Sequence, residues 1–137
     1  MALRVLSFSL GVFLLFMGLD KIGWFMDSGF LTRTLQQWRG MARPLARWYI
    51  DTIALPGAPV FARVVPLAEL AAATSLILGV RVRLAAALAI VMVVNIHIAA
   101  DVIFRYNYLW NAYGPPVLGG LLSLAINHTR LPFSVSK

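Results

Sequence analysis

Four long apolar runs constrain the fold of this chain more than any other feature of its sequence. They cover about residues 3–24, 60–80, 84–104 and 106–126. Each is close to the ~20 residues that an α-helix needs to cross ~30 Å of hydrocarbon. The runs are continuous, whereas membrane strands alternate apolar and polar residues. The sequence therefore predicts an all-α integral membrane four-helix bundle, folded as one domain over residues 1–137.

Composition supports a membrane environment over a soluble one. Hydrophobic residues make up 61% of the chain and charged residues only 12%. A lipid-exposed bundle needs few polar residues on its outside, because lipid tails solvate apolar side chains. The formal net charge is +7, and the basic residues lie beside the apolar runs. We therefore expect membrane lipids with anionic headgroups as partners, and no nucleic acid.

Two features of the sequence narrow the chemistry and the processing of the chain. It has no cysteine, which excludes disulfides, cysteine-ligated iron–sulfur clusters and thiol redox chemistry. Arg4 and the apolar run after it resemble a signal peptide, but no A-x-A cleavage site follows. We expect this run to be retained as the first membrane helix.

The connection between the first two apolar runs is long and patterned. Within residues 28–53, one helical face carries apolar side chains and the others carry arginine and glutamine; the apolar positions are Leu31, Leu35, Trp38 and Ala42. This pattern predicts an amphipathic interfacial helix, with Asp27 or Ser28 as its cap. Pro44 should end it, and Leu45–Ile53 should form a second short helix. The apolar face of this helix could pack on lipid or on the rim of the bundle, and the sequence does not choose between them.

Charge is distributed unevenly between the two ends of the predicted bundle. Four spans place both termini on one side, whose basic residues are Arg4, Arg81, Arg83, Arg130 and Lys137. The opposite side carries seven basic residues and every acid: Asp20, Asp27, Asp51, Glu69 and Asp101. Because short loops determine topology more than long ones, we predict that both termini are cytoplasmic, in a bacterial inner membrane.

Polar residues at membrane depth form the candidate site. Lys21, Glu69, His97, Asp101 and Asn111 converge on the outer half of the predicted bundle. Ionisable residues in a membrane usually face the bundle interior and pair. One interpretation is a pocket for a quinone headgroup or a proton relay. The other is a structural network of ion pairs that holds the helices together.

Few cofactors fit these residues. The two histidines, His97 and His128, are expected to lie about 20 Å or more apart along the axis, too far for a haem held by both. Glu69, His97 and Asp101 match no specific metal signature, so we expect no metal site. No intrinsic cofactor is expected, while a quinone, lipid or pigment at the periphery stays open. The tryptophans and tyrosines near the outer end are interpreted as an aromatic belt at the interface.

Three short motifs carry a family resemblance. They are GLDKI at positions 18–22, PLAEL at 66–70 and LGVRVRLAA at 78–86. Together with the four-span layout, they make the chain resemble the DoxX-like family of small four-helix bacterial membrane proteins. By that resemblance, Lys21 and Glu69 match the characteristic polar positions of the family. The segment Phe30–Ile53, rich in tryptophan and arginine, departs from a typical member.

The resemblance implies a fold more firmly than an activity. Relatives include subunits of thiosulfate:quinone oxidoreductase and components linked to membrane redox complexes. We therefore carry two hypotheses forward. One is a non-catalytic accessory subunit of a larger membrane redox complex, respiratory or photosynthetic, in contact with other integral membrane subunits. The alternative is a quinone-interacting oxidoreductase subunit with a polar outer-leaflet pocket.

Overall fold

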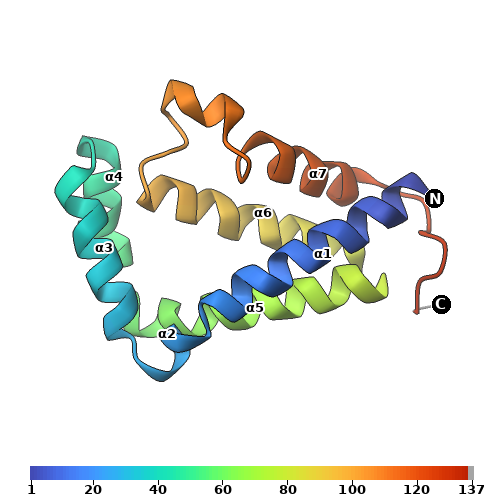
Figure 1. Ribbon diagram of the computed structural model, residues 1–137, viewed down its shortest axis with the longest axis horizontal. Helices are drawn as coiled ribbons and strands as arrows, with labels where there is room; N and C mark the ends of the chain where they lie inside the picture. The colour runs from blue at the N-terminus through green and yellow to red at the C-terminus, as the bar shows by residue number, and fades with distance from the viewer. Residues whose placement is uncertain (136–137) are drawn as a thin grey trace.

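The structure is a computed structural model that describes residues 1–135, and all regular structure in that range is helical. In chain order the elements are α1 (Ala2–Asp20), α2 (Ile22–Met26), α3 (Gly29–Met41), α4 (Pro44–Tyr49), the π-helical turn η1 (Ile50–Ala54), α5 (Ala58–Leu78), α6 (Val82–Ala99), the 3₁₀ turn η2 (Tyr106–Trp110) and α7 (Pro115–Ile126). In Figure 1, α1, α5, α6 and α7 lie side by side, and α3 and α4 stand across one end of them.

Three helices are long and apolar enough to cross a membrane. They are α1, α5 and α6, with 19, 21 and 18 residues. Each contains an 18-residue window with a mean hydropathy of at least 1.6. These helices confirm membrane-spanning segments close to the first three predicted ones, and the chain is treated below as an integral membrane protein.

The fourth apolar run does not form the continuous helix expected over residues 106–126. Its α-helix, α7, has 12 residues, which is about 18 Å of helix. Gly114, Pro115 and Pro116 explain the difference. Proline fits the first turn of a helix but lacks an N–H and clashes with a preceding turn. The chain therefore starts a new helix at Pro115, and the residues before it form η2 and a loop.

Two other predicted spans end earlier than the apolar runs suggest. The first helix stops at Asp20, and Lys21 joins it to the short α2. The third predicted span reaches residue 104, but α6 ends at Ala99. Asp101 adopts a left-handed backbone conformation with φ +55°, which an α-helix cannot continue through. Apolar side chains after it extend the run in the sequence without extending the helix.

Helices α1 and α5 approach closely because small residues line their contact. A Cβ added at Gly11 would lie 2.7 Å from Ile77 Cγ1 and 3.0 Å from the Ala73 carbonyl oxygen. The Ser7 hydroxyl donates to the Leu76 carbonyl at 2.7 Å, which adds a buried hydrogen bond to the same contact. Apolar side chains of α1, α5, α6 and α7 complete the core, including Leu14, Leu76, Leu121 and Leu124.

The segment of α3, α4 and η1, called the arm here, has its own small core. The prediction of an amphipathic helix ended by Pro44 is confirmed, because α3 ends at Met41 and α4 begins at Pro44. Leu31 and Leu35 are buried, and they cluster with residues at the start of α5 and the end of α6: Ala58, Ala62 and Ala99. The apolar face of α3 therefore packs on the rim of the bundle, one of the two alternatives that the sequence left open.

Details of the arm differ slightly from the expectation. The Asp27 side chain accepts a hydrogen bond from the Gly29 N–H at 2.8 Å, whereas Ser28 makes no side-chain cap. The second short helix is composed of α4 and the π-helical turn η1. Met41 and Trp48 are 69% and 56% exposed, so the arm also presents apolar side chains away from the bundle.

Candidate functional site

A buried ion pair joins the end of α1 to the middle of α5. Lys21 Nζ lies 3.0 Å and 3.1 Å from the two carboxylate oxygens of Glu69. It also donates to the Met17 carbonyl oxygen at 3.2 Å. Both side chains are almost fully buried, with 8% and 3% exposure. An ammonium has three donors, and these contacts use all of them, so the pair is balanced within the protein.

Local backbone geometry explains why this pair forms. Lys21 sits where α1 ends, and its N–H donates to the Gly18 carbonyl oxygen at 3.2 Å. Gly18 lets the two helices approach, because a Cβ there would lie 3.0 Å from the Leu70 side chain and 3.3 Å from Glu69 Cβ. After the break at Asp20, the lysine side chain reaches back to the Met17 carbonyl oxygen and to Glu69.

His97, near the end of α6, meets Tyr108 of η2. The histidine Nδ1 and the tyrosine hydroxyl are 2.9 Å apart, and the two rings meet edge to face with centroids 5.4 Å apart. Burial raises the pKa of the Tyr108 phenol, so the hydroxyl keeps its proton at neutral pH. Among residues 1–135, Nδ1 is the ring nitrogen of His97 with a hydrogen-bond partner, which leaves Nε2 free for another contact.

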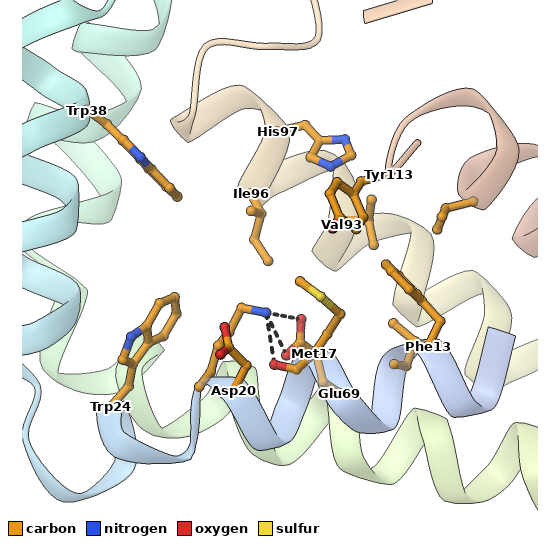
Figure 2. A pocket seen from close by; sticks show the side chains of 13 residues that line it. Phe13, Met17, Asp20, Trp24, Trp38, Glu69, Val93, Ile96, His97 and Tyr113 are labelled. Atoms are coloured by element: carbon orange, nitrogen blue, oxygen red, sulfur yellow. Dashed lines mark hydrogen bonds and ion pairs between the residues drawn. The ribbon is translucent and has the colours of Figure 1, made fainter. Parts of the chain in front are cut away.

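The ion pair and His97 line one pocket of about 260 Å³. Figure 2 shows the polar groups among apolar and aromatic side chains from α1, α2, α3, α6 and the segment before α7. The aromatic residues of its wall are Phe13, Trp24, Trp38 and Tyr113. A mostly apolar cavity with a few convergent polar groups is the usual form of a small-molecule site.

Asp101 lies outside this pocket and fastens the arm to the end of α6. Its carboxylate accepts hydrogen bonds from the Arg43 backbone N–H at 3.1 Å and from the Arg43 guanidinium at 3.0–3.2 Å. Arg105 donates to the same carboxylate at 2.9 Å. The hydrogen bonds from Arg43, more than any other contact, lower the pKa of Asp101 from 3.8 to about 2. The carboxylate is therefore charged at any physiological pH.

The five predicted site residues thus separate into three places. Lys21, Glu69 and His97 line the pocket. Asp101 holds the arm, and Asn111 accepts a hydrogen bond from the Tyr113 N–H in the loop before α7. His97 and Asp101 do not share a helical face, because α6 ends between them. Asn111 follows the 3₁₀ turn η2 and lies in the loop before α7, so it is not on a helix with the other site residues.

Several residues of the site were not singled out in the sequence. Trp24 and Trp38 were interpreted as belt residues, but both line the pocket. Arg43 was treated as part of the polar face of the arm, and its contact with Asp101 depends on how the arm folds back. The signal for Arg43 was its place directly before Pro44, which makes it the N-cap residue of α4.

The titratable residues do not gather into a metal site. Within the described residues, no group of three histidine, cysteine or acidic side chains could hold a metal ion. Glu69 is engaged with Lys21, and Asp101 with two arginines. What the pocket offers a ligand is an ammonium–carboxylate pair, one imidazole nitrogen and aromatic faces.

These features define a helical integral membrane protein with a buried ion pair in the wall of an apolar pocket. The sequence profile of the DoxX family matches residues 2–101, which covers α1 to α6 and the first two residues after α6. The chain therefore belongs to the DoxX family, and the resemblance noted in its motifs is confirmed. No curated protein and no solved structure matches the chain.

Proposed function

We propose that this protein is a non-catalytic accessory subunit of a larger membrane redox complex, respiratory or photosynthetic. The observation that carries the proposal is the incomplete fourth span. At about 18 Å, α7 covers little more than half of the ~30 Å hydrocarbon layer. Irregular backbone at membrane depth is tolerated where other protein covers it. A helix of a partner subunit, packed along α7 and η2, would supply that cover.

The side chains of η2 and the loop after it suit such a contact. Tyr106, Leu109 and Trp110 are 78%, 66% and 68% exposed. Tyrosine and tryptophan are enriched in protein interfaces, where their large faces are buried and their polar groups find partners. This exposed aromatic surface lies beside Tyr108, which contacts His97, so a partner here would also approach the pocket.

Purification from native membranes in mild detergent tests the accessory role. A tagged chain should co-migrate on a native gel with a complex that carries redox cofactors, detected by its visible absorbance. The variant Leu109→Ser/Trp110→Ser should dissociate from that complex. Phe16→Ser, a change at a 66% exposed position on α1, should stay associated. A chain that always migrates as a lone monomer would contradict the proposal.

The proposed location is the bacterial inner membrane, with both termini on the cytoplasmic side. Support comes from Arg81, in the tight turn between α5 and α6, and Arg83, in the first turn of α6; the loop is short enough for the positive-inside rule to apply. The absence of native cysteine allows a direct test. In intact spheroplasts, a membrane-impermeant maleimide should label Gln37→Cys in the arm but not Thr129→Cys after α7. The reverse labelling would overturn this orientation.

A second candidate function is quinone binding in the pocket, as part of an oxidoreductase. The specific observation is the combination of Lys21, Glu69 and the free His97 nitrogen on an otherwise apolar and aromatic wall. An N–H at the His97 Nε2 can donate to a quinone carbonyl, and the ring packs on aromatic faces; the Lys21 ammonium, whose three donors are engaged, lies in the wall as part of the ion pair. In this function, the protein positions the headgroup and exchanges protons with it.

Tryptophan fluorescence distinguishes a pocket ligand from nonspecific partitioning into detergent. Titration with a short-chain quinone should quench the Trp24 and Trp38 emission saturably. Trp38→Phe should lose part of the saturable quenching, and Trp48→Phe, outside the pocket, should keep it. Glu69→Gln and His97→Gln should reduce quinone-linked activity of the assembled complex. Unchanged activity in both variants would rule out this role.

A further inference from the structure

A second pocket lies at the opposite end of the bundle, where Figure 1 places both chain termini. Its volume is about 340 Å³. One wall is the turn between α5 and α6 together with the first turn of α6, and it contributes Arg81 and Arg83. The other wall is the segment after α7, which contributes Thr129, Arg130 and Ser134. Nothing in the candidate site described above involves this pocket.

The two walls are locked together by contacts between distant parts of the chain. The Val135 N–H donates to the Leu78 carbonyl oxygen at 3.0 Å. Gly79 ends α5 with φ +75°, and a Cβ there would lie 2.8 Å from Ser134 Oγ. The pocket is therefore defined by specific contacts of the fold, between the turn and the segment that packs over it.

Three guanidinium groups in this pocket have little to neutralise them. The Arg83 side chain donates to the Ala125 carbonyl oxygen at 3.3 Å, and no hydrogen bond or ion pair within residues 1–135 engages the side chain of Arg81 or Arg130. Four of the five acids, Asp20, Asp27, Asp51 and Asp101, lie in segments at the other end of the bundle. Glu69, in the middle of α5, is already paired with Lys21. Arginine cannot release its proton, so clustered arginines repel unless an anion binds.

Arg4 shows what a purely structural arginine looks like at the same end. Its two terminal nitrogens donate to the Leu76 and Ile77 carbonyl oxygens at 3.1 Å and 2.6 Å, which satisfies the last turn of α5. The Arg81 side chain makes no such hydrogen bond to a helix end within residues 1–135. Its backbone adopts φ +47°, a left-handed conformation unfavourable for a residue with a side chain. Strain of this kind clusters at binding sites, where it is compensated by the contacts it permits.

We propose that Arg81, Arg83 and Arg130 form a binding site for the phosphodiester headgroup of an anionic phospholipid. The turn joins two membrane-spanning helices, so the pocket lies at the depth of lipid phosphates. Arginine forks bind phosphate oxygens in pairs of parallel hydrogen bonds. Leu84, 52% exposed beside the pocket, offers apolar surface to an acyl chain.

Native mass spectrometry of the purified protein in detergent tests the site. The probes are dioleoylphosphatidylglycerol and dioleoylphosphatidylcholine, whose headgroups differ in net charge. The wild-type chain should retain phosphatidylglycerol in preference to phosphatidylcholine. Each arginine near anionic lipid contributes enough to change retention roughly fivefold, so Arg81→Gln/Arg83→Gln/Arg130→Gln should lower it roughly a hundredfold.

The matched control removes three exposed arginines at the other end, in Arg33→Gln/Arg47→Gln/Arg63→Gln. This control has the same net charge as the Arg81/Arg83/Arg130 triple variant and should keep the preference for phosphatidylglycerol. The single variants Arg81→Gln and Arg130→Gln leave the Arg83 contact intact and should each show about a fivefold loss, which covers the case in which the triple variant does not fold.

Three results would overturn the proposal. Equal loss in the control variant would show that only net charge matters. Displacement of the lipid by inorganic phosphate at an equal concentration would make the pocket a site for free phosphate. Equal retention of both lipids by the wild-type chain would leave an acidic segment of a partner protein as the group that neutralises the arginines.

Discussion

The two ends of the bundle treat their charges in opposite ways. At the end that carries the candidate site, four of the five acids form ion pairs with basic side chains, and these acids are Asp27, Asp51, Glu69 and Asp101. At the end with the termini, the Arg4 and Arg83 side chains donate to backbone carbonyls. The Arg81 and Arg130 side chains have no hydrogen bond or ion pair within residues 1–135. At the first end most carboxylates are neutralised by side chains of the chain itself. The other end depends on its surroundings for neutralisation.

Even within the paired end, the two buried carboxylates differ. Glu69 lies in the middle of the membrane-spanning helix α5 and has one basic partner, Lys21. Asp101 has two arginines and a backbone N–H, at the point where α6 ends and the arm attaches. The first pair joins two helices of the bundle, and the second holds a peripheral segment. Their removal should therefore affect different parts of the molecule.

The largest effect on stability is expected from Lys21→Met. It leaves the Glu69 carboxylate buried without its partner, and breaking a buried pair in this way costs about 3–5 kcal/mol. Unfolding by denaturant in detergent, followed by circular dichroism, measures the change. The double variant Lys21→Met/Glu69→Leu removes both charges and should recover most of the loss. If both variants were equally unstable, packing rather than the charge pair would be responsible.

A smaller and more local effect is expected from Asp101→Asn. The change removes the charge that Arg43 and Arg105 share, although those arginines are partly exposed and water compensates them. We expect a loss of about 1–2 kcal/mol, confined to the arm. Hydrogen exchange should become faster in α3 and α4 and stay unchanged in α1 and α5. Uniform acceleration in all helices would contradict the division between bundle and arm.

Acid should weaken the same attachment in the wild-type chain. The pKa of Asp101 is lowered in the folded protein, so its stabilising contribution is complete above its ordinary value of 3.8 and is lost as the pH falls toward about 2. Emission from Trp38 and Trp48 in the arm should change across that interval. Asp101→Asn should lack this transition, and its persistence there would assign it to another carboxylate.

The smallest effect on stability is expected at the other end, from Arg130→Gln. This arginine has no partner among residues 1–135, so its removal should change the free energy of unfolding by no more than about 0.5 kcal/mol. The same denaturant titration in lipid-free detergent measures it. A loss comparable to that of Lys21→Met would show that the basic end is also held together by contacts within the chain.

The prediction from sequence succeeded where a single run of residues carries the information. The lengths of the apolar runs identified α1, α5 and α6, because a membrane span must satisfy its own backbone. The face of Leu31 and Leu35, with Pro44 after it, identified the two helices of the arm. The motifs around Lys21 and Glu69 identified the family, and the two residues do form a pair.

The prediction was wrong where hydrophobicity continues beyond a helix. Residues 100–104 were expected to extend the third span and residues 106–114 to begin the fourth, and they do neither. The left-handed Asp101 and the prolines at 115 and 116 end and start helices regardless of the hydropathy around them. The expected convergence of His97 and Asp101 on one site depended on that long helix, and in the structure only His97 lines the pocket.

What the sequence determined by itself was the membrane environment, the family and the separation of acids from unpaired arginines, since these follow from composition and local pattern. Only the tertiary structure decided which residues share a pocket. Trp38 reaches it from the arm, Lys21 from the end of α1 and His97 from α6. Those positions depend on how helices far apart in sequence approach one another, and that depends on close contacts such as Gly18 against Leu70.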